Sequence, residues 1–297
     1  MKTSKSPINV ARVAYEAAQK AIPAYSHAKS PKKFTQPQLI ACLVLRQFFK
    51  TDYRGTQAIL EDSTDLRKAL ELTRVPDYTT LHKAAQKFGK ADIMRKLFVS
   101  TIGMAAAIGL LVAPVRAAID GTGFESHHVS DYFVSRKSKG GASVQETTYT
   151  HFPKVGIVVD CATHLVLGAI PSRGPSTDVM HFPAALREAL KSSSIHTLIA
   201  DMGYDSEAAH VLARDRHGIE SIIPPRMWKK FGRLPRKKYR LLMATNFDKV
   251  QYGQRWQVET VNSMVKRNLG SALRATKVHG QYREIRFRLF THNAMVV

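Results

Sequence analysis

Two aspartates stand where an apolar run ends and a glycine follows. Asp120 closes the run "VRAAID" and precedes Gly121, and Asp201 closes "IHTLIAD" shortly before Gly203. The carboxyl end of a strand is a common place for the functional site of an α/β sheet, and glycines let another group come close. For Asp120 the alternative is a turn-forming Asp-Gly pair.

The second candidate, Asp201, has a neighbour with a simpler explanation. Asp205 or Ser206 is expected to cap the helix that begins in "DSEAAHVLARDR", since Asp and Ser are preferred at helix N-caps. No comparable local role is evident for Asp201. It therefore remains a candidate for chemistry.

A third carboxylate, Glu259, lies in "YGQRWQVETVNSMVKRNLG", which we predict to be one helix from Tyr252 to Gly270. At about 100° per residue, one side of this helix is apolar and the other is charged. An ordinary solvated face with an Arg255–Glu259 pair is the alternative, and periodicity alone favours it. The predicted charged side carries Tyr252, Arg255, Glu259 and Lys266, and the inward side carries Val258, Val261, Met264, Val265 and Leu269.

Together the three carboxylates suggest phosphoryl-transfer chemistry. Two strand-end aspartates and a helix glutamate can bind a pair of hard divalent cations through oxygen. Such a pair would activate a water or a sugar hydroxyl and stabilise the leaving oxygen of a displacement at phosphorus. The chain contains 45 Lys and Arg against 23 Asp and Glu, a formal charge of +22. This balance favours nucleic acid as the partner, with an anionic membrane surface second.

The elements that must position these residues change character along the chain. Up to about residue 109 the sequence is predicted to be helical. Thr35 and Pro37 are expected to start one helix, and Asp77 and Gly89 to bound another. We predict a helical DNA-binding or dimerisation region over 1–112, although a small helical bundle without DNA contacts has the same pattern.

The remaining residues, 113–297, are predicted to form an α/β domain. Three apolar β-branched runs occur in succession, and helices then alternate with strands, which predicts a mixed sheet flanked by helices. A basic connection, 224–245, precedes the helix that carries Glu259. The predicted strands are 115–120, 154–160, 164–170, 195–201 and 219–224, and a helix capped by Thr177 or Asp178 is expected over 177–190.

The stretch "YGQRWQVETVNSMVK" fits the pattern Y-x2-R-x3-E-x6-K without a gap, and it resembles the signature of a group of insertion-sequence transposases with a DDE triad. The blocks "AIDGTGF" and "ADMGYDS" look like that family's two aspartate regions. The resemblance runs from about Val115 to Asn293. It implies a ribonuclease-H-like catalytic fold with Asp120 on the first strand, Asp201 after the fourth and Glu259 on a late helix.

The same resemblance implies the partners of the site. Mg²⁺ or Mn²⁺ would be the cofactor, two ions per site, held by Asp120, Asp201 and Glu259. Double-stranded DNA, the terminal inverted repeats of a mobile element and its target, would be the substrate, held by a homodimer. Tyr252, Arg255 and Lys266 would contact the element end.

Further DNA contacts are expected from the basic connection, which has eight Lys or Arg and no acid between Ser221 and Arg240. The candidates there are Trp228, Lys229, Lys230, Arg236, Lys237 and Lys238. The loop "SRKSKGGAS", 135–143, could follow a DNA backbone or be a plain solvated loop. Trp256 is expected to pack in the core.

The cysteines, the histidines, Asp160 and one uncharged stretch suggest other kinds of site or segment, which we consider in turn. Cys42 and Cys161 lie in separate apolar segments, so neither a disulfide framework nor a cysteine zinc site is expected. Asp160 is the main competitor of Asp120 as the first carboxylate. His127, His128 and His151 lack the spacing of a metal site. For the uncharged stretch 97–115 we expect a buried helix in preference to a membrane span.

We therefore predict a cytoplasmic, nucleoid-associated prokaryotic DNA transposase. The alternatives are a metal-dependent nuclease that cuts without strand transfer, and a DNA-binding transposase relic without catalysis. The intact triad argues against a relic, but the sequence stops at Val297 within a helix, "REIRFRLFTHNAMVV", that is expected to continue. If residues beyond it complete the fold or the dimer, the chain would bind DNA without cutting it.

Overall fold

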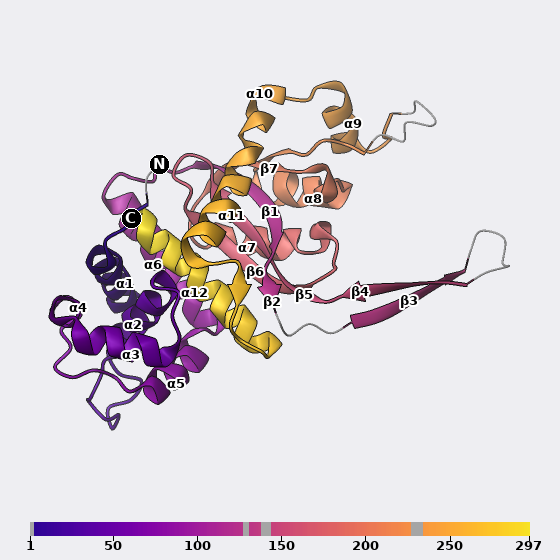
Figure 1. The fold of residues 1–297 in the computed structure, drawn as a ribbon. Coiled ribbons are helices and arrows are strands. Elements are labelled where there is room, and N and C mark those ends of the chain that lie inside the picture. Colours follow the sequence, from indigo (N-terminus) through magenta and orange to yellow (C-terminus); the bar gives the residue numbers. More distant parts are fainter. Residues whose placement is uncertain (1–2, 127–130, 138–143, 227–233) are drawn as a thin grey trace.

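The computed structural model describes residues 3–126, 131–137, 144–226 and 234–297, and shows a helical N-terminal part packed against a mixed sheet (Figure 1). Thr35 caps α2 through a reciprocal hydrogen-bond pair with Gln38, and Asp77 caps α5, which ends at Gly89, as predicted. The helices of this part are α1 (Pro7–Ala21), α2 (Gln36–Phe48), α3 (Tyr53–Asp62), α4 (Thr64–Ala69), α5 (Tyr78–Phe88) and α6 (Ala91–Ala107).

The sheet in the described residues has five strands in the order β6-β5-β1-β7-β8. Strand β1 is antiparallel to β5 and parallel to β7, so the predicted mixed, ribonuclease-H-like arrangement is confirmed. The strands are β1 (Val115–Gly123), β5 (Phe152–Asp160), β6 (Val166–Gly174), β7 (Ile195–Ala200) and β8 (Glu220–Ile222).

Helices cover both faces of this sheet, and alternate strand residues decide which face meets which helices. On β1, Ala117 and Ile119 join the apolar cluster of α7, whereas Ala118 joins the cluster that contains α11. This alternation is the period of two that a strand imposes. The helices that follow the first strands are α7 (Phe182–Leu190), α8 (Glu207–Val211), α9 (Lys238–Thr245), α10 (Lys249–Tyr252), α11 (Trp256–Leu269) and α12 (Val278–Val296).

A long hairpin that the sequence did not predict extends away from the sheet (Figure 1). Its strands are β3 (Asp131–Lys137) and β4 (Val144–Thr150), paired antiparallel. Residues 138–143 of the predicted basic loop lie outside the described part. A second small pairing joins β2 (Glu125–Ser126) to β9 (Ala272–Leu273). It brings the end of β1 close to the segment after α11.

Three local predictions were wrong. The helix expected from Thr177 or Asp178 begins only at Phe182, after a short 3₁₀ turn over Asp178–Met180, because Pro183 suits a first helical turn. Tyr252 to Gly270 is not one helix, since the 3₁₀ turn Gly253–Arg255 separates α10 from α11. Trp256 is 53% exposed and does not pack in the core.

One continuous apolar core crosses the predicted boundary between 112 and 113. It includes residues of α1 and α2, of strands β1 and β5, and of α11 and α12. Helix α12 packs between the N-terminal helices and the sheet (Figure 1). Among the described residues, the structure contains no helix that is long and apolar enough to cross a membrane. The stretch 97–115 instead forms the end of α6 and the approach to β1.

Candidate active site

Asp120 on β1 lies beside Asp201, which directly follows the neighbouring parallel strand β7. The register pairs Ile119 of β1 with Ala200 of β7, and each aspartate is the next residue of its chain. Two residues earlier, Ala118 and Ile199 both belong to the cluster on the α11 side of the sheet. Both carboxylates therefore start from the face that α11 covers.

Burial and neighbouring acids perturb Asp120. Desolvation raises its pKa to about 6, and the carboxylates of Asp178 and Asp201 act in the same direction. The backbone amide of Gly121 and the guanidinium of Arg255 lower the pKa only in part. On the α11 side, Nδ2 of Asn262 lies 3.4 Å from Oδ2 of Asp120. Sequence analysis missed Asn262, whose only signal is its spacing of three residues from Glu259 on one helix face.

Asp201 has a structural role that sequence analysis did not find. Its carboxylate accepts a hydrogen bond from the backbone N–H of Gly203 and caps a 3₁₀ turn over Met202–Tyr204. Ser206, as predicted, caps α8. The cap occupies Oδ1 of Asp201. Oδ2 makes no hydrogen bond or ion pair with the described residues, so the cap does not exclude a second role.

Glu259 forms an ion pair with Arg255, as the alternative reading of the charged face predicts. Oε1 of Glu259 lies 2.6 Å from a terminal guanidinium nitrogen of Arg255, and the Glu259 side chain is 53% exposed. Arg255 also acts electrostatically on Asp120. The guanidinium is thus close to both the helix glutamate and the strand aspartate.

A fourth carboxylate lies at this edge of the sheet. Oδ1 of Asp178 pairs with Nζ of Lys154 at 2.6 Å, and a side chain at Gly121 would overlap that oxygen. The position at which Gly203 would carry a Cβ lies 2.9 Å from Oδ1 of Asp201 and 3.9 Å from Oδ2 of Asp178. The sequence predicts Asp178 only as a possible helix cap, because no local pattern indicates that the turn over Asp178–Met180 folds back to the strand ends.

The phenol of Tyr204 is close enough to these carboxylates to interact with them electrostatically, and Tyr204 is 1% exposed. Burial raises its pKa, and Asp178, Asp120 and Asp201 raise it further. Its hydroxyl has no hydrogen-bond partner among the described residues. The Tyr204 hydroxyl is thus a buried hydrogen-bond donor near three acids.

A family model described as the transposase DDE domain matches residues 113–294, from the approach to β1 nearly to the end of α12. The chain belongs to this transposase family. No individual curated protein matches it. The match covers all three predicted triad residues, as well as Asp178, Asn262 and Tyr204. Membership in a DDE transposase family implies binding of DNA, and members typically use divalent metal ions.

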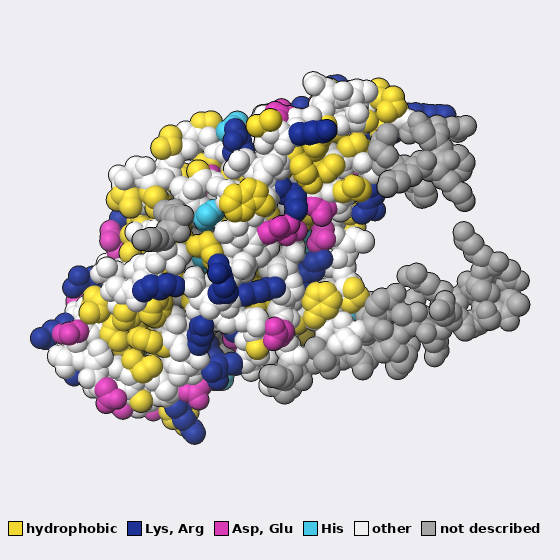
Figure 2. Space-filling model, turned by 45° about the horizontal axis from the view of Figure 1, so that its top comes forward, with side chains coloured by type: hydrophobic (Ala, Val, Ile, Leu, Met, Phe, Trp, Pro, Cys, Tyr) yellow, Lys and Arg dark blue, Asp and Glu magenta, His cyan; other side chains and the backbone are white. Residues whose placement is uncertain are grey.

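Tyr252 and Lys266, two of the residues predicted to contact DNA, each lie against an aromatic ring. Tyr252 is half-buried against Phe247, with ring centroids 5.0 Å apart. Burial raises its pKa, and Arg255 opposes this. Lys266 lies about two helical turns beyond Glu259 on α11. Its Nζ is 5.8 Å from the ring centroid of Phe124. Figure 2 shows a row of Lys and Arg side chains over the middle of one face, beside a group of acidic side chains.

The DNA contacts predicted in the basic connection form no hydrogen bond or ion pair with Asp120, Asp201 or Glu259 among the described residues. Arg236, Lys237 and Lys238 are exposed at the start of α9. Trp228, Lys229 and Lys230 lie outside the described residues, as do His127 and His128. His151 faces the carbonyl of Gly174, with Nδ1 at 3.2 Å from the oxygen.

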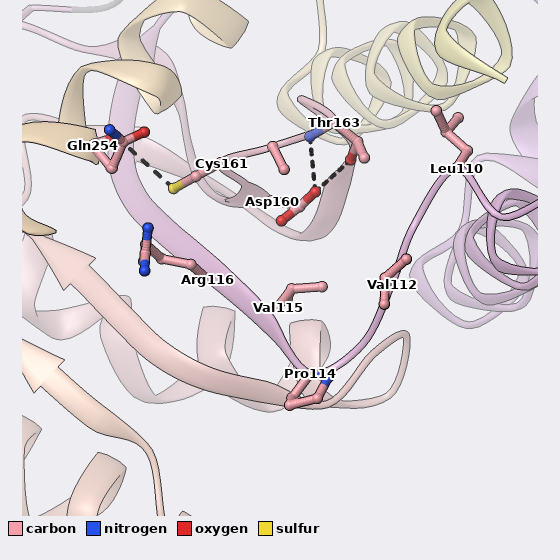
Figure 3. A pocket seen from close by; sticks show the side chains of 10 residues that line it. Leu110, Val112, Pro114, Val115, Arg116, Asp160, Cys161, Thr163 and Gln254 are labelled. Carbon is pink, nitrogen blue, oxygen red and sulfur yellow. Dashed lines mark hydrogen bonds between the residues drawn. The ribbon is translucent and has the colours of Figure 1, made fainter.

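The competing aspartate, Asp160, has a structural role in this DDE-family chain. It is 3% exposed, and its Oδ2 accepts hydrogen bonds from the backbone N–H and the hydroxyl of Thr163, at 2.8 and 2.6 Å. Figure 3 shows these bonds at the rim of a pocket lined by Arg116, Cys161 and Gln254. Asp160 holds a turn, and Cys161 is a free, buried thiol like Cys42.

The carboxylates of Asp120, Asp178, Asp201 and Glu259 do not form a preformed metal-binding site. Across residues 3–126, 131–137, 144–226 and 234–297, no three His, Cys, Asp or Glu side chains are grouped closely enough to hold a metal ion. Two of these carboxylates are instead engaged in ion pairs, Glu259 with Arg255 and Asp178 with Lys154.

Proposed function

We propose that this chain is an insertion-sequence transposase of the Y-x2-R-x3-E-x6-K group that cleaves the ends of its element and joins them to target DNA. One observation carries the proposal: the register sets Asp120 beside Asp201 on the sheet face that α11 covers, and α11 carries Glu259. Such a constellation, in a chain of formal charge +22, is suited to phosphoryl transfer on a polyanion.

Hard divalent cations fit the donors at this edge. Burial raises the pKa of Asp120 to about 6, and the neighbouring carboxylates of Asp178 and Asp201 act in the same direction. A bound cation would relieve this repulsion. Mg²⁺ or Mn²⁺ would be held by Asp120, Asp201 and Glu259, the last after leaving Arg255. The Glu259 side chain is exposed enough to turn. When bound, such ions lower the pKa of water and stabilise charge on phosphate oxygens.

The chain's own residues bind and orient the substrate. Arg255 exchanges Glu259 for a phosphate oxygen, because a guanidinium binds phosphate through two parallel hydrogen bonds. Asn262 keeps one oxygen of Asp120 directed toward α11. Lys266, two turns further along the same helix, neutralises a neighbouring phosphate, and Tyr252 contacts the element end.

The substrate is double-stranded DNA with terminal inverted repeats, and a homodimer holds both ends. Hydrolysis breaks a phosphodiester at the element end and leaves a 3′-hydroxyl. That hydroxyl then attacks a target phosphodiester, so that one P–O bond forms as another breaks. The basic connection, including Trp228, Lys229, Lys230 and residues 236–238, holds the flanking backbone.

Changing Glu259 to Gln tests the assignment. The variant retains the shape of the side chain but loses its charge, so it should bind labelled element ends as wild type does and lose cleavage in Mg²⁺ by at least about a hundredfold. Glu16→Gln, in an exposed ion pair with Lys20 on α1, is the matched control. Cleavage at the wild-type rate by the Glu259 variant would remove this residue from the site.

The two alternatives differ from the proposal in products. A nuclease would release cut ends that never join a plasmid, and a relic would bind ends without cutting them. Incubating labelled ends with supercoiled plasmid and Mg²⁺ separates the three cases on one gel. Joined products are expected.

A further inference from the structure

A cavity of about 220 Å³ lies where α2, the segment after α11 and α12 meet. Its lining comes from both the N-terminal helices and the C-terminal part of the chain. Its charged lining consists of four cations and a single carboxylate: Arg46, Lys50, Arg274, Arg288 and Glu284.

Arg46 is the most unusual member of this lining. It is 6% exposed, and its Cζ lies 4.2 Å from the ring centroid of Tyr53. In the described part of the chain its guanidinium makes no hydrogen bond and no ion pair, and its Nε is buried without a partner. A buried guanidinium without an anion is costly, so the cavity offers a cation that lacks its counter-charge.

The other charges of the cavity are already engaged and do not neutralise Arg46. Glu284 pairs with Arg288 at 2.8 Å and also accepts the backbone N–H groups of Arg274 and Ala275. Nζ of Lys50 donates to the carbonyl of Arg267 at 2.9 Å. These contacts hold the cations in place around the cavity. The lining keeps an excess of three positive charges.

We propose that this cavity binds one phosphodiester group of the DNA backbone, with Arg46 as the central ligand. The inference rests on the proposed function for the source of the phosphate, whereas the anion chemistry stands on the cavity itself. A planar guanidinium flanked by further cations matches a tetrahedral oxyanion. Since a water takes about 30 Å³ in the liquid, the volume accommodates a phosphate group with several waters.

The position of the cavity along the protein supports DNA as the source. Helix α11 runs from Glu259 through Lys266 to Leu269, and the cavity begins at Leu269 and Gly270. A duplex that crosses the active site along α11 would therefore pass the cavity next. Because Arg46 lies in the last turn of α2 and Lys50 follows that helix, this contact would bring the N-terminal helices into DNA binding.

The test compares the full-length wild type with Arg46→Met, which keeps most of the side-chain volume and removes the charge. One arm measures the rise in Tm with inorganic phosphate. The other measures the salt dependence of binding to an element-end duplex. We expect the phosphate-induced rise to be lost, and the slope of log K against log salt to fall by about one phosphate contact. Arg12→Met, exposed on α1, is the matched control.

Each result decides the inference. An unchanged phosphate response in the Arg46 variant overturns the anion site, and a lost phosphate response with an unchanged salt slope overturns DNA as its source. Should Arg46→Met fold poorly, Lys50→Gln and Arg274→Gln, both at exposed residues, must show the same loss of slope. Cleavage by wild type and by Glu259→Gln is a separate readout, so failure of the proposed function is recognised independently.

Discussion

At the level of single residues, the backbone beside Asp120 is unusually crowded. The Lys154–Asp178 ion pair packs against the Cα of Gly121, the residue after Asp120. Glycine is required there for space, since its backbone is an ordinary extended strand paired with Gly156. The pair can therefore approach Asp120 only because Gly121 has no side chain.

Gly121→Ala should disturb the active site more than the fold. The added methyl would overlap Oδ1 of Asp178 and lie 2.9 Å from Cε of Lys154, so the ion pair must move. Overpacking of this kind costs about 1–3 kcal/mol, and we expect cleavage to fall by more than tenfold in Mg²⁺. Gly156→Ala, whose Cβ would meet only Cβ of His181 at 3.6 Å, is the control on the paired strand. Equal effects of the two substitutions would contradict this explanation.

Asp120→Asn should stabilise the metal-free protein at neutral pH. Because the folded state raises the pKa of Asp120 from 3.8 to about 6, this group favours folding in its protonated form. Its contribution is fully present below about pH 4 and is lost as the pH rises through 6. The shift is roughly two pKa units, so at about 1.4 kcal/mol per unit the gain for the variant at pH 8 is about 3 kcal/mol.

Thermal melts of both proteins in EDTA from pH 4 to pH 8 measure this stability difference between Asp120→Asn and wild type. The Tm difference between Asp120→Asn and wild type should grow with pH and level off above pH 7. Asp160→Ala is the contrast, because it removes the acceptor of two Thr163 hydrogen bonds and should lower Tm. A Tm difference for Asp120→Asn that is independent of pH would contradict the prediction.

At the level of elements, Asp205 connects the basic connection to the sheet. Its side chain is 1% exposed, pairs with the guanidinium of Arg240 at 2.6 Å and accepts the backbone N–H of Arg226 at 2.8 Å. One buried carboxylate thus holds both sides of the segment between 226 and 240. The predicted capping role at α8 belongs to Ser206 instead.

Asp205→Ala should release this segment and weaken DNA binding. Removing one partner of a buried, hydrogen-bonded pair costs about 3 kcal/mol, less here because Arg240 is partly exposed. We expect faster trypsin cleavage at Arg226 and Arg240 and a several-fold loss of affinity for duplex DNA. Asp62→Ala, at an exposed acid on α3, should change neither. Wild-type trypsin kinetics in Asp205→Ala would exclude this anchoring role.

At the level of the whole molecule, helix α12 unites the two predicted domains. Its buried residues belong to the same cluster as α1, α2, β1 and β5. A helix buried on most of its sides is typical of the centre of one cooperative unit. The apolar core therefore continues across the predicted boundary at 112/113.

Leu45→Ala should therefore destabilise the sheet as well as the N-terminal helices. Leu45 is 1% exposed on α2, and truncating such a side chain costs about 2–5 kcal/mol. Hydrogen exchange should show equal losses of protection in α2 and in β1 and β5. Loss confined to the N-terminal helices would mean that two domains unfold independently. Val250→Ala, at an 86% exposed position, is the control.

Much of the candidate site was predictable because strand ends and helix faces are local patterns. Asp120, Asp201 and the inward valines of α11 were identified from apolar runs and spacing, and the mixed sheet from the order of elements. Trp256 was misjudged because one exposed aromatic at a helix start does not break the apolar periodicity. The hairpin β3–β4 was missed because its sequence is too polar to indicate strands.

The sequence alone determined which residue types, charge balance and Y-x2-R-x3-E-x6-K spacing are present, and these predict phosphoryl transfer, because they are properties of the chain itself. Only the tertiary structure decided which groups meet. Asp178, Lys154, Asn262 and Tyr204 surround the two aspartates, and Arg46 faces a cavity built with residues more than two hundred positions away. Such encounters depend on strand register and on the packing of α11 and α12, which no local pattern specifies.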